Sequence, residues 1–222
     1  MSKVFIGVGH GGSDPGAVAN NVKEKDLNLS IALACRDMLE RHGVSVKMSR
    51  TKDENDPIVD EVKECNAYSP DLAVDIHNNA GGGDGGEVFY SHLGGKGKTL
   101  AENILAEIVK VGQNSRGIKT RVNSQGKDYY AFIRNTSCPS VIVECAFVDN
   151  ATDLKILATE SQRETMGRSI AKGILASLGI ALQSEKPTLY RVQVGAYSVK
   201  ANAEAMRDKI KAAGFDAFIV KE

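Results

Sequence analysis

Long apolar runs are missing from this sequence of 222 residues, and so is an excess of charge of either sign. The longest apolar stretches, around Val4 and Val141, run for about five to seven residues, whereas a helix needs ~20 to cross a bilayer. The 28 Lys and Arg residues are balanced by 28 Asp and Glu residues. We therefore expect neither membrane insertion nor binding to nucleic acid.

The sequence also lacks paired cysteines and a visible export signal. Its cysteines form neither a Cys-x-x-Cys pair nor a regular disulfide framework. They are Cys35, Cys65, Cys138 and Cys145. We expect reduced thiols. Residues 1–7 lead directly into a strand pattern, without the apolar core and small-residue cleavage site of a signal peptide. We therefore expect synthesis in the cytoplasm without a signal peptide.

What is present is an alternation of short strand-like runs with longer segments of helical period. Such alternation is typical of a sheet with helices on both faces. Strands are expected at residues 4–8, 44–48, 72–76, 88–90, 130–133 and 141–144. Core-facing helices are expected over residues 27–38, 100–111 and 166–178, and Gly43 follows the first of them as a C′ glycine. The predicted fold class is α/β, with an open, mostly parallel twisted sheet of about six strands.

A change in pattern near residue 180 predicts a domain boundary. Residues 1–180 form the predicted main domain, and residues 181–188 lack periodicity and are predicted to be a linker. Residues 189–222 alternate apolar and polar, then take helical spacing, then become strand-like again at 215–220, which predicts a small C-terminal β-α-β unit. A unit of roughly 34 residues buries little core alone, so we expect it to pack on the main domain or on a second copy.

Three predicted strands run into side chains that can bind a metal or transfer a proton. These side chains are His10, His77 and Glu144. Because ligands of open α/β sheets bind beyond the carboxyl ends of the strands, we expect the three to border one crevice. Glycines at 11–12 and 81–83 leave the backbone open to an approaching substrate.

Two histidines and one carboxylate are a typical ligand set for a catalytic zinc ion, whose fourth position is held by water. His10 and His77 supply the two nitrogens. Glu24 precedes the first predicted helix, and the loop before it is long enough to fold it back over the end of the first strand. Asp14 and Asp26 remain alternatives to Glu24, because sequence spacing alone does not choose between them.

Glu144 is the candidate proton carrier, while three other reactive side chains are interpreted as structural. Zinc lowers the pKa of water, but a proton must still pass from that water to the leaving amine. His42 lies at a predicted helix C-terminus, where a histidine cation suits the helix dipole. His92 lies in a polar loop, and Cys145 points away from Glu144 to the opposite face of the strand.

Residues 7–12 read Gly-Val-Gly-His-Gly-Gly, which satisfies the spacing of a dinucleotide-binding motif. That motif requires a helix that starts within the glycine string, so that its N-terminus meets the pyrophosphate. Here Asp-Pro-Gly at 14–16 is typical of a turn, and helical periodicity resumes only near Glu24. The pattern does not favour nucleotide binding.

Four motifs follow one another in order over about residues 2–180. They read His-Gly-Gly-Ser-Asp-Pro-Gly-Ala at 10–17, Glu-Lys-Asp-Leu-Asn-Leu at 24–29, Asp-Ile-His-Asn-Asn-Ala at 75–80 and Pro-Ser-Val-Ile-Val-Glu at 139–144. Together they closely resemble the motifs of the zinc-dependent N-acetylmuramoyl-L-alanine amidases of the Amidase_3 type. The chain departs from many members at Asp75, where they carry Ser, and at residues 62–64, where they carry an Arg.

The resemblance implies one zinc ion per chain, held by His10, Glu24 and His77, with Glu144 as the catalytic carboxylate. It implies hydrolysis of the amide between the lactyl group of N-acetylmuramic acid and the L-alanine of the stem peptide. From their positions near strand ends, we expect three further residues to line the substrate groove, namely Asn78, Glu87 and Arg134.

The C-terminal segment 189–222 resembles one half of a sporulation-related (SPOR) wall-binding domain, whose full form is a tandem pair of β-α-β units. The resemblance implies binding to peptidoglycan, and the single half predicts a homodimer formed through this unit. A chain of this kind would act on the cell wall after lysis or pore-mediated release, as an endolysin or a sporulation autolysin. The alternatives are another zinc hydrolase of the same polymer, a stem peptidase or a deacetylase, and a non-catalytic wall-binding protein.

Overall fold

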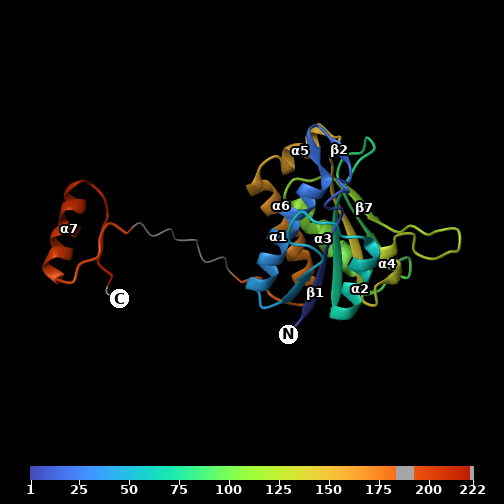
Figure 1. Cartoon of the computed structure of the whole chain (residues 1–222), viewed down its shortest axis with the longest axis horizontal. Coiled ribbons are helices and arrows are strands. Elements are labelled where there is room, and N and C mark those ends of the chain that lie inside the picture. The colour runs from blue at the N-terminus through green and yellow to red at the C-terminus, as the bar shows by residue number, and fades with distance from the viewer. Residues whose placement is uncertain (184–192, 221–222) are drawn as a thin grey trace. The chain divides into compact units, whose positions relative to one another are not determined.

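The computed structural model describes residues 1–183 and 193–220, and residues 1–183 form one compact unit (Figure 1). This unit is built on a six-stranded sheet with the order β4-β1-β5-β8-β6-β7. The strands are β1 (Lys3–Val8), β4 (Ser45–Met48), β5 (Leu72–Asn79), β6 (Gly86–Tyr90), β7 (Ser115–Lys119) and β8 (Ser140–Phe147). Strands β4, β1, β5 and β8 are parallel, whereas β6 is antiparallel to β8. The predicted mostly parallel α/β sheet is confirmed.

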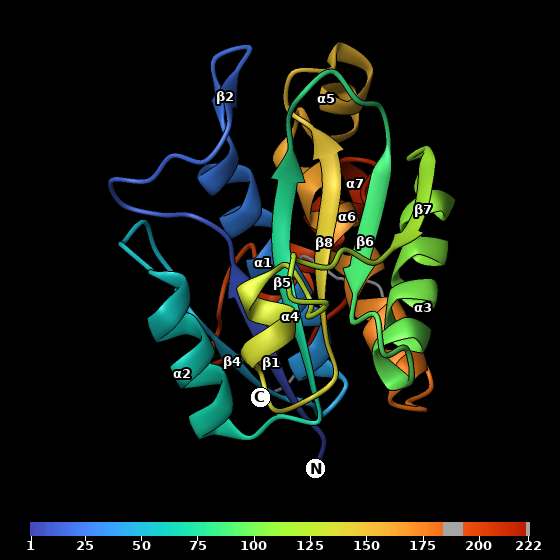
Figure 2. The ribbon, with the colours of Figure 1, turned by 90° about the vertical axis from the view of Figure 1, so that its right-hand side faces the viewer.

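Helices cover both faces of the sheet, as Figure 2 shows, with α4 in front of the strands and α1 and α6 behind them. The helices of this unit are α1 (Glu24–Arg41), α2 (Ile58–Tyr68), α3 (Lys96–Lys110), α4 (Ala131–Asn135), α5 (Ala151–Leu157) and α6 (Glu160–Ser177). On one face, α1, α3 and α6 bury Ile31, Ile104 and Ile170 completely in the main core. The three predicted core-facing helices are therefore confirmed.

The other face of the sheet carries α2 and α4 and has a smaller core of its own. Phe5 from β1, Cys65 from α2 and Phe132 from α4 are all buried in this second cluster. Because side chains alternate along a strand, every second residue of β1, β5 and β8 points to this face, and His77 and Glu144 of the predicted site are among them. The second face therefore positions the site. No helix in the described part of the chain is long and apolar enough to cross a membrane.

One predicted strand of this unit is wrong. Residues 130–133, predicted as a strand, are instead the N-cap and first three residues of the short helix α4, in which the adjacent residues Phe132 and Ile133 are both buried. Two consecutive buried side chains fit one face of the sheet only if the backbone is not extended, because a strand would turn one of them away. The sixth strand is instead β7, an edge strand without a buried residue, whose sequence Ser-Arg-Gly-Ile-Lys has no apolar alternation. Helix α2 was not predicted.

The C-terminal unit contains the predicted helix, which is α7 (Lys200–Ala212). Residues 215–220, predicted as a strand, form no strand with any described part of the chain. A strand forms only where a neighbouring strand pairs with its backbone, and an isolated pair of strands has marginal stability in water. The first predicted strand of this unit, near residue 190, and most of the predicted linker lie outside the described residues.

Candidate metal centre and active site

Three residues that are far apart in the sequence meet beyond the carboxyl ends of β1 and β5. One ligand atom each from His10, Glu24 and His77 lies within 4.8 Å of the other two. His10 follows β1, His77 lies in β5, and Glu24 is the first residue of α1. The small hairpin of β2 (Val18–Ala19) and β3 (Val22–Lys23) precedes α1 and returns the chain to the end of β1.

The carboxylate of Glu24 lies between the two imidazoles. Its Oε2 is 3.2 Å from Nε2 of His10, and its Oε1 is 3.0 Å from Nδ1 of His77. Burial alone would raise the pKa of Glu24, but the hydrogen bonds from both histidines outweigh it and hold the pKa below its usual range. The backbone N–H groups of Ala17 and Asn78 also donate to this carboxylate, at 2.9 and 3.1 Å. Glu24 is thus fixed as an anion with both oxygens facing the histidines.

Each histidine has a second carboxylate on its other nitrogen. Nδ1 of His10 is 2.8 Å from Oδ2 of Asp14, and Nε2 of His77 is 3.1 Å from Oδ2 of Asp75. In metal sites such outer carboxylates fix the orientation and tautomer of the ligating ring. They leave Nε2 of His10 and Nδ1 of His77 facing Glu24, which gives the N, N, O donor set that zinc prefers. The residues present therefore fit a zinc ion.

The loop that carries His10 is held by a buried arginine that sequence reasoning missed. His10 itself has a φ of 63°, a left-handed conformation that is costly for a residue with a side chain. Arg50 is 2% exposed, and its guanidinium donates to the carbonyls of Val8 at 3.1 Å and of Lys25 at 2.8 Å. Because it ties β1 to the start of α1, Arg50 fixes the relation between His10 and Glu24. Its contacts are with backbone carbonyls, which leave no pattern in the sequence.

Glu144 stands beside His77 in the sheet. The two residues are register partners in the β5–β8 pair, and Glu87 is the partner of Glu144 on the other side. Burial raises the pKa of Glu144 to about 7, and the nearby charges of Glu24 and Asp75 add to this, although His77 opposes it. Its Oε2 has no hydrogen-bond partner among the described residues. A buried carboxyl with a free oxygen and a pKa near neutrality suits a group that both accepts and donates a proton.

The structure places the three expected substrate-groove residues differently from one another. Asn78 is 2% exposed and donates to Oδ1 of Asn28, so it supports the Glu24 cradle from within the core. Glu87 is buried beside Glu144, and Arg116 donates to it at 2.7 Å while Lys119 forms a second ion pair. Arg134 is exposed and donates to the carbonyls of Asp128 and Tyr129.

The remaining reactive residues lie away from this centre. His42 caps α1, with Nδ1 2.8 Å from the carbonyl of Met38, and His92 is 2.8 Å from Oδ1 of Asp128. Cys145 is fully buried in the main core, on the face opposite Glu144, and all four cysteines are free. No helix starts inside the glycine string at 7–12, because α1 begins only at Glu24.

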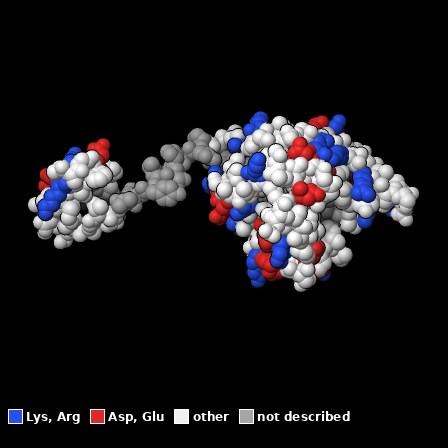
Figure 3. All heavy atoms as spheres, turned by 90° about the horizontal axis from the view of Figure 1, so that it is seen from above, with Lys and Arg blue, Asp and Glu red and all other residues white. Residues whose placement is uncertain are grey.

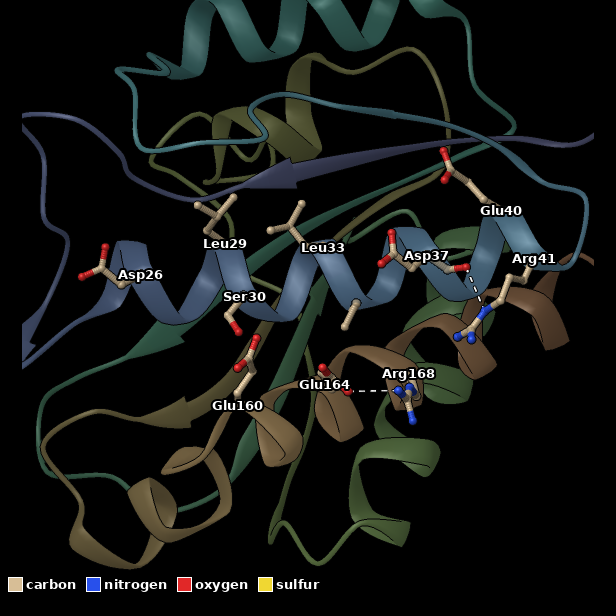
Figure 4. Close-up of a pocket in the computed structure, with 11 residues that line it drawn as sticks. Asp26, Leu29, Ser30, Leu33, Asp37, Glu40, Arg41, Glu160, Glu164 and Arg168 are labelled. Atoms are coloured by element: carbon tan, nitrogen blue, oxygen red, sulfur yellow. Dashed lines mark hydrogen bonds and ion pairs between the residues drawn. The ribbon is translucent and has the colours of Figure 1, made fainter. Parts of the chain in front are cut away.

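A broad groove lies between α1 and α6 (Figure 4). Asp26, Glu160 and Glu164 line it together with Leu29 and Leu33, but none of the zinc-binding candidates does. Asp26 is therefore not a ligand in this arrangement. On the face of this unit in Figure 3, acidic and basic side chains are interspersed, in keeping with the balanced composition.

Comparisons with known proteins agree with this geometry. A family model described as N-acetylmuramoyl-L-alanine amidase matches residues 4–176, and one described as SPOR domain matches residues 169–221. The chain is 36% identical over 224 residues to the sporulation-specific N-acetylmuramoyl-L-alanine amidase of Bacillus subtilis (strain 168), covering 99% of this chain and 85% of that protein. It is 35% identical over 194 residues to an endolysin of Bacillus phage SPP1, covering 83% of this chain and 69% of the endolysin.

A solved structure similar to this chain is the catalytic domain of CwlV, an N-acetylmuramoyl-L-alanine amidase from Bacillus (Paenibacillus) polymyxa var. colistinus. It superposes with a TM-score of 0.73 at 27% identity, over 82% of this chain and 100% of that domain.

Proposed function

This chain belongs to the N-acetylmuramoyl-L-alanine amidase family, and from this premise we propose that His10, Glu24 and His77 hold a catalytic zinc ion beside Glu144. As a member of that family, it hydrolyses the amide between N-acetylmuramic acid and the L-alanine of the stem peptide in bacterial peptidoglycan. The observation that carries the metal proposal is the meeting of the three ligand atoms within 4.8 Å. A zinc ion bound there would act as a Lewis acid on the attacking water and on the scissile carbonyl.

The proton transfers are assigned to Glu144. Its carboxylate takes a proton from the attacking water as the new carbon–oxygen bond forms, and then gives it to the nitrogen as the carbon–nitrogen bond breaks. The products are a lactyl carboxylate on the sugar and a stem peptide with a free L-alanine amine. The free Oε2 of Glu144 and its burial support this role, because nothing else in the described chain competes for that oxygen.

Two substitutions separate metal binding from proton transfer. Glu144→Gln should keep zinc and lose turnover by about 10³-fold, since a positioned general base contributes typically 10²–10⁴-fold. His77→Ala should lose both zinc and turnover. Zinc content by mass spectrometry and release of fragments from purified walls measure the two effects, with Glu102→Gln on the surface of α3 as the control. A fully active Glu144→Gln protein would refute this mechanism.

Mass spectrometry of the released fragments distinguishes the amidase from its alternatives. Intact stem peptides that begin with L-alanine, beside uncut sugars, are expected only from the amidase. Shortened peptides would indicate a stem peptidase, and loss of acetyl groups a deacetylase. A chelator should abolish the release.

The C-terminal unit is proposed to bind the glycan strands of peptidoglycan and to pair with the same unit of a second chain. The match to the SPOR domain supports wall binding. Large apolar side chains support pairing, because Val194, Phe215 and Phe218 are 61%, 70% and 82% exposed. Such a group of apolar side chains in so small a unit is typical of an interface.

Sedimentation of the full chain tests the pairing. The wild-type protein should sediment as a dimer, and Phe218→Asp should sediment as a monomer. Leu93→Asp, at an equally exposed apolar residue of the catalytic unit, is the matched control and should remain dimeric. A wild-type monomer at high protein concentration would contradict the pairing.

A further inference from the structure

The outer partner of His77 is part of a longer buried arrangement. Asp75 lies two residues before His77 on the same face of β5, is 2% exposed, and has its Oδ2 3.1 Å from Nε2 of His77. Its second oxygen, Oδ1, has no hydrogen-bond partner in the described chain. Leaving such a group unsatisfied in the interior is costly, so the surroundings of Oδ1 need an explanation.

A second buried carboxyl lies next to that oxygen. Glu61, from α2, is 4% exposed, and its Oε1 also lacks a hydrogen-bond partner among residues 1–183 and 193–220. Gly7 of β1 is the register partner of Asp75. A methyl group added to Gly7 would lie 1.9 Å from Oε1 of Glu61 and 2.8 Å from Oδ1 of Asp75. Both free oxygens therefore border the space that this glycine leaves open.

Two adjacent buried carboxylates repel each other, but one proton between them converts the repulsion into a hydrogen bond. Burial raises the pKa of Glu61 well above its usual range, and the charges of Asp75 and Asp56 raise it further. Oδ2 of Asp75, by contrast, already lies at hydrogen-bond distance from a ring nitrogen of His77. The proton therefore belongs on Glu61, whose O–H can donate to Oδ1 of Asp75.

We propose that Glu61 and Asp75 are positioning residues that fix His77 as a metal ligand through its Nδ1. The neutral carboxyl of Glu61 donates to Oδ1 of Asp75, and Oδ2 of Asp75 accepts the N–H of His77 Nε2. With Nε2 protonated, Nδ1 keeps its lone pair directed toward the position between His10 and Glu24. The inference rests on the proposed zinc site, and it assigns to α2 a role in metal binding.

Substitutions at Glu61 test whether it acts as a neutral donor. Glu61→Gln retains an N–H donor without charge and should bind zinc within about twofold of the wild type. Glu61→Met has similar length but no donor, and it should weaken zinc binding by about 10–100-fold, as loss of an outer-shell partner does. Glu64→Met, one turn further along α2 at an exposed ion pair with Lys47, is the matched control and should leave the affinity unchanged. Competition with a chromophoric chelator measures each affinity.

The tautomer of His77 is a measurement that would stay unchanged if Glu61 and Asp75 only stabilised the fold. Nitrogen NMR of the zinc-loaded chain should show His77 protonated at Nε2 and bound through Nδ1 in the wild type and in Glu61→Gln. Asp75→Ala should shift the ring toward a mixture of tautomers and weaken zinc binding by about 10–100-fold. Adding Glu61→Met to Asp75→Ala should cost little more, because Glu61 acts through Asp75.

Three results would overturn the proposal. One is a Glu61→Gln protein as impaired as Glu61→Met, which would mean that Glu61 acts as an anion, for example toward a second cation. Another is wild-type zinc affinity in a folded Glu61→Met protein. The third is an unchanged His77 tautomer in Asp75→Ala. Because zinc affinity and the NMR spectrum are measured without wall hydrolysis, both remain informative even if the proposed zinc dependence of the activity fails.

Discussion

Gly9 leaves the space that the imidazole of His77 occupies, and Gly9→Ala should therefore disable the metal centre without unfolding the chain. A Cβ at residue 9 would lie 2.1 Å from Cε1 and 2.3 Å from Nε2 of His77. Carbon atoms in contact prefer about 3.5–4.0 Å, so the ring must move by about 1 Å or more. The same ring contacts Glu24 and Asp75, and a shift of this size breaks both hydrogen bonds.

The expected loss follows from that displacement. Misplacing a reacting group by 1 Å can cost about 10²-fold in rate, and disturbing a ligand's outer contacts costs about 10–100-fold in metal affinity. We therefore expect Gly9→Ala to lower wall hydrolysis by about 10²-fold or more and to weaken zinc binding by at least about tenfold. The backbone should tolerate the change, because Gly9 is not among the residues with positive φ.

Turbidity loss of purified walls, chelator competition and thermal unfolding together measure the prediction. The control is Gly97→Ala in α3, where the added methyl would meet only the carbonyl oxygen of Ser140 at 3.6 Å, an ordinary contact. Wild-type zinc affinity and turnover in Gly9→Ala would refute the assigned position of His77. A large loss of stability would instead show that the ring cannot move and that the backbone yields.

Three further predictions concern packing, metal removal and pH. Gly167→Ala should destabilise the chain by about 1–3 kcal/mol in chemical denaturation, because the added methyl would lie 2.2 Å from the carbonyl oxygen of Ile31 in α1. Gly97→Ala should instead stabilise the chain by up to about 1 kcal/mol, and equal effects of the two substitutions would contradict this packing. A chelator should abolish wall hydrolysis and leave the circular dichroism spectrum unchanged, because the candidate ligands remain hydrogen-bonded to one another; loss of the helical signal would contradict it. Burial would raise the pKa of Asp128, but hydrogen bonds from the His92 backbone and side chain and from the Ser91 hydroxyl hold the pKa below its usual range. The loss of stability in Asp128→Asn should therefore be full above about pH 4 and should shrink as the pH falls through the lowered pKa. A loss that does not depend on pH would show that the charge of Asp128 does not stabilise this loop.

The sheet and the meeting point of the candidate ligands could be predicted from the sequence because both follow from local patterns. Strands β1, β5 and β8 are apolar runs, and parallel neighbours end at the same edge of a sheet. The side chains near the ends of these strands, such as His10 and Glu144, can therefore be placed in one region even when the paths of the loops are unknown. Glu24 needed the resemblance to a family, since its place depends on the path of a loop that spacing leaves open.

The elements that escaped prediction depend on contacts between distant parts of the chain. Strand β7 has no apolar alternation and exists because β6 offers it an edge. Arg50 and Glu61 are charged residues in the interior, which composition alone would place at the surface. Arg50 is stabilised by carbonyls of β1 and α1, and Glu61 occupies space that Gly7 leaves open. Neither relation leaves a periodic signal in the sequence.

The charge balance of the site supports a divalent cation at its centre. The carboxylates grouped around the two histidines are those of Asp14, Glu24, Asp75, Glu87 and Glu144. Arg116 and Lys119 neutralise Glu87, but no lysine or arginine of the described chain forms an ion pair with the other four. Two protonated imidazoles would offset only half of that charge. A histidine that binds zinc must be neutral, so a cation of charge two bound between the imidazoles would supply those two charges in place of the ring protons. It would also favour the ionised, basic form of Glu144, which hydrolysis requires.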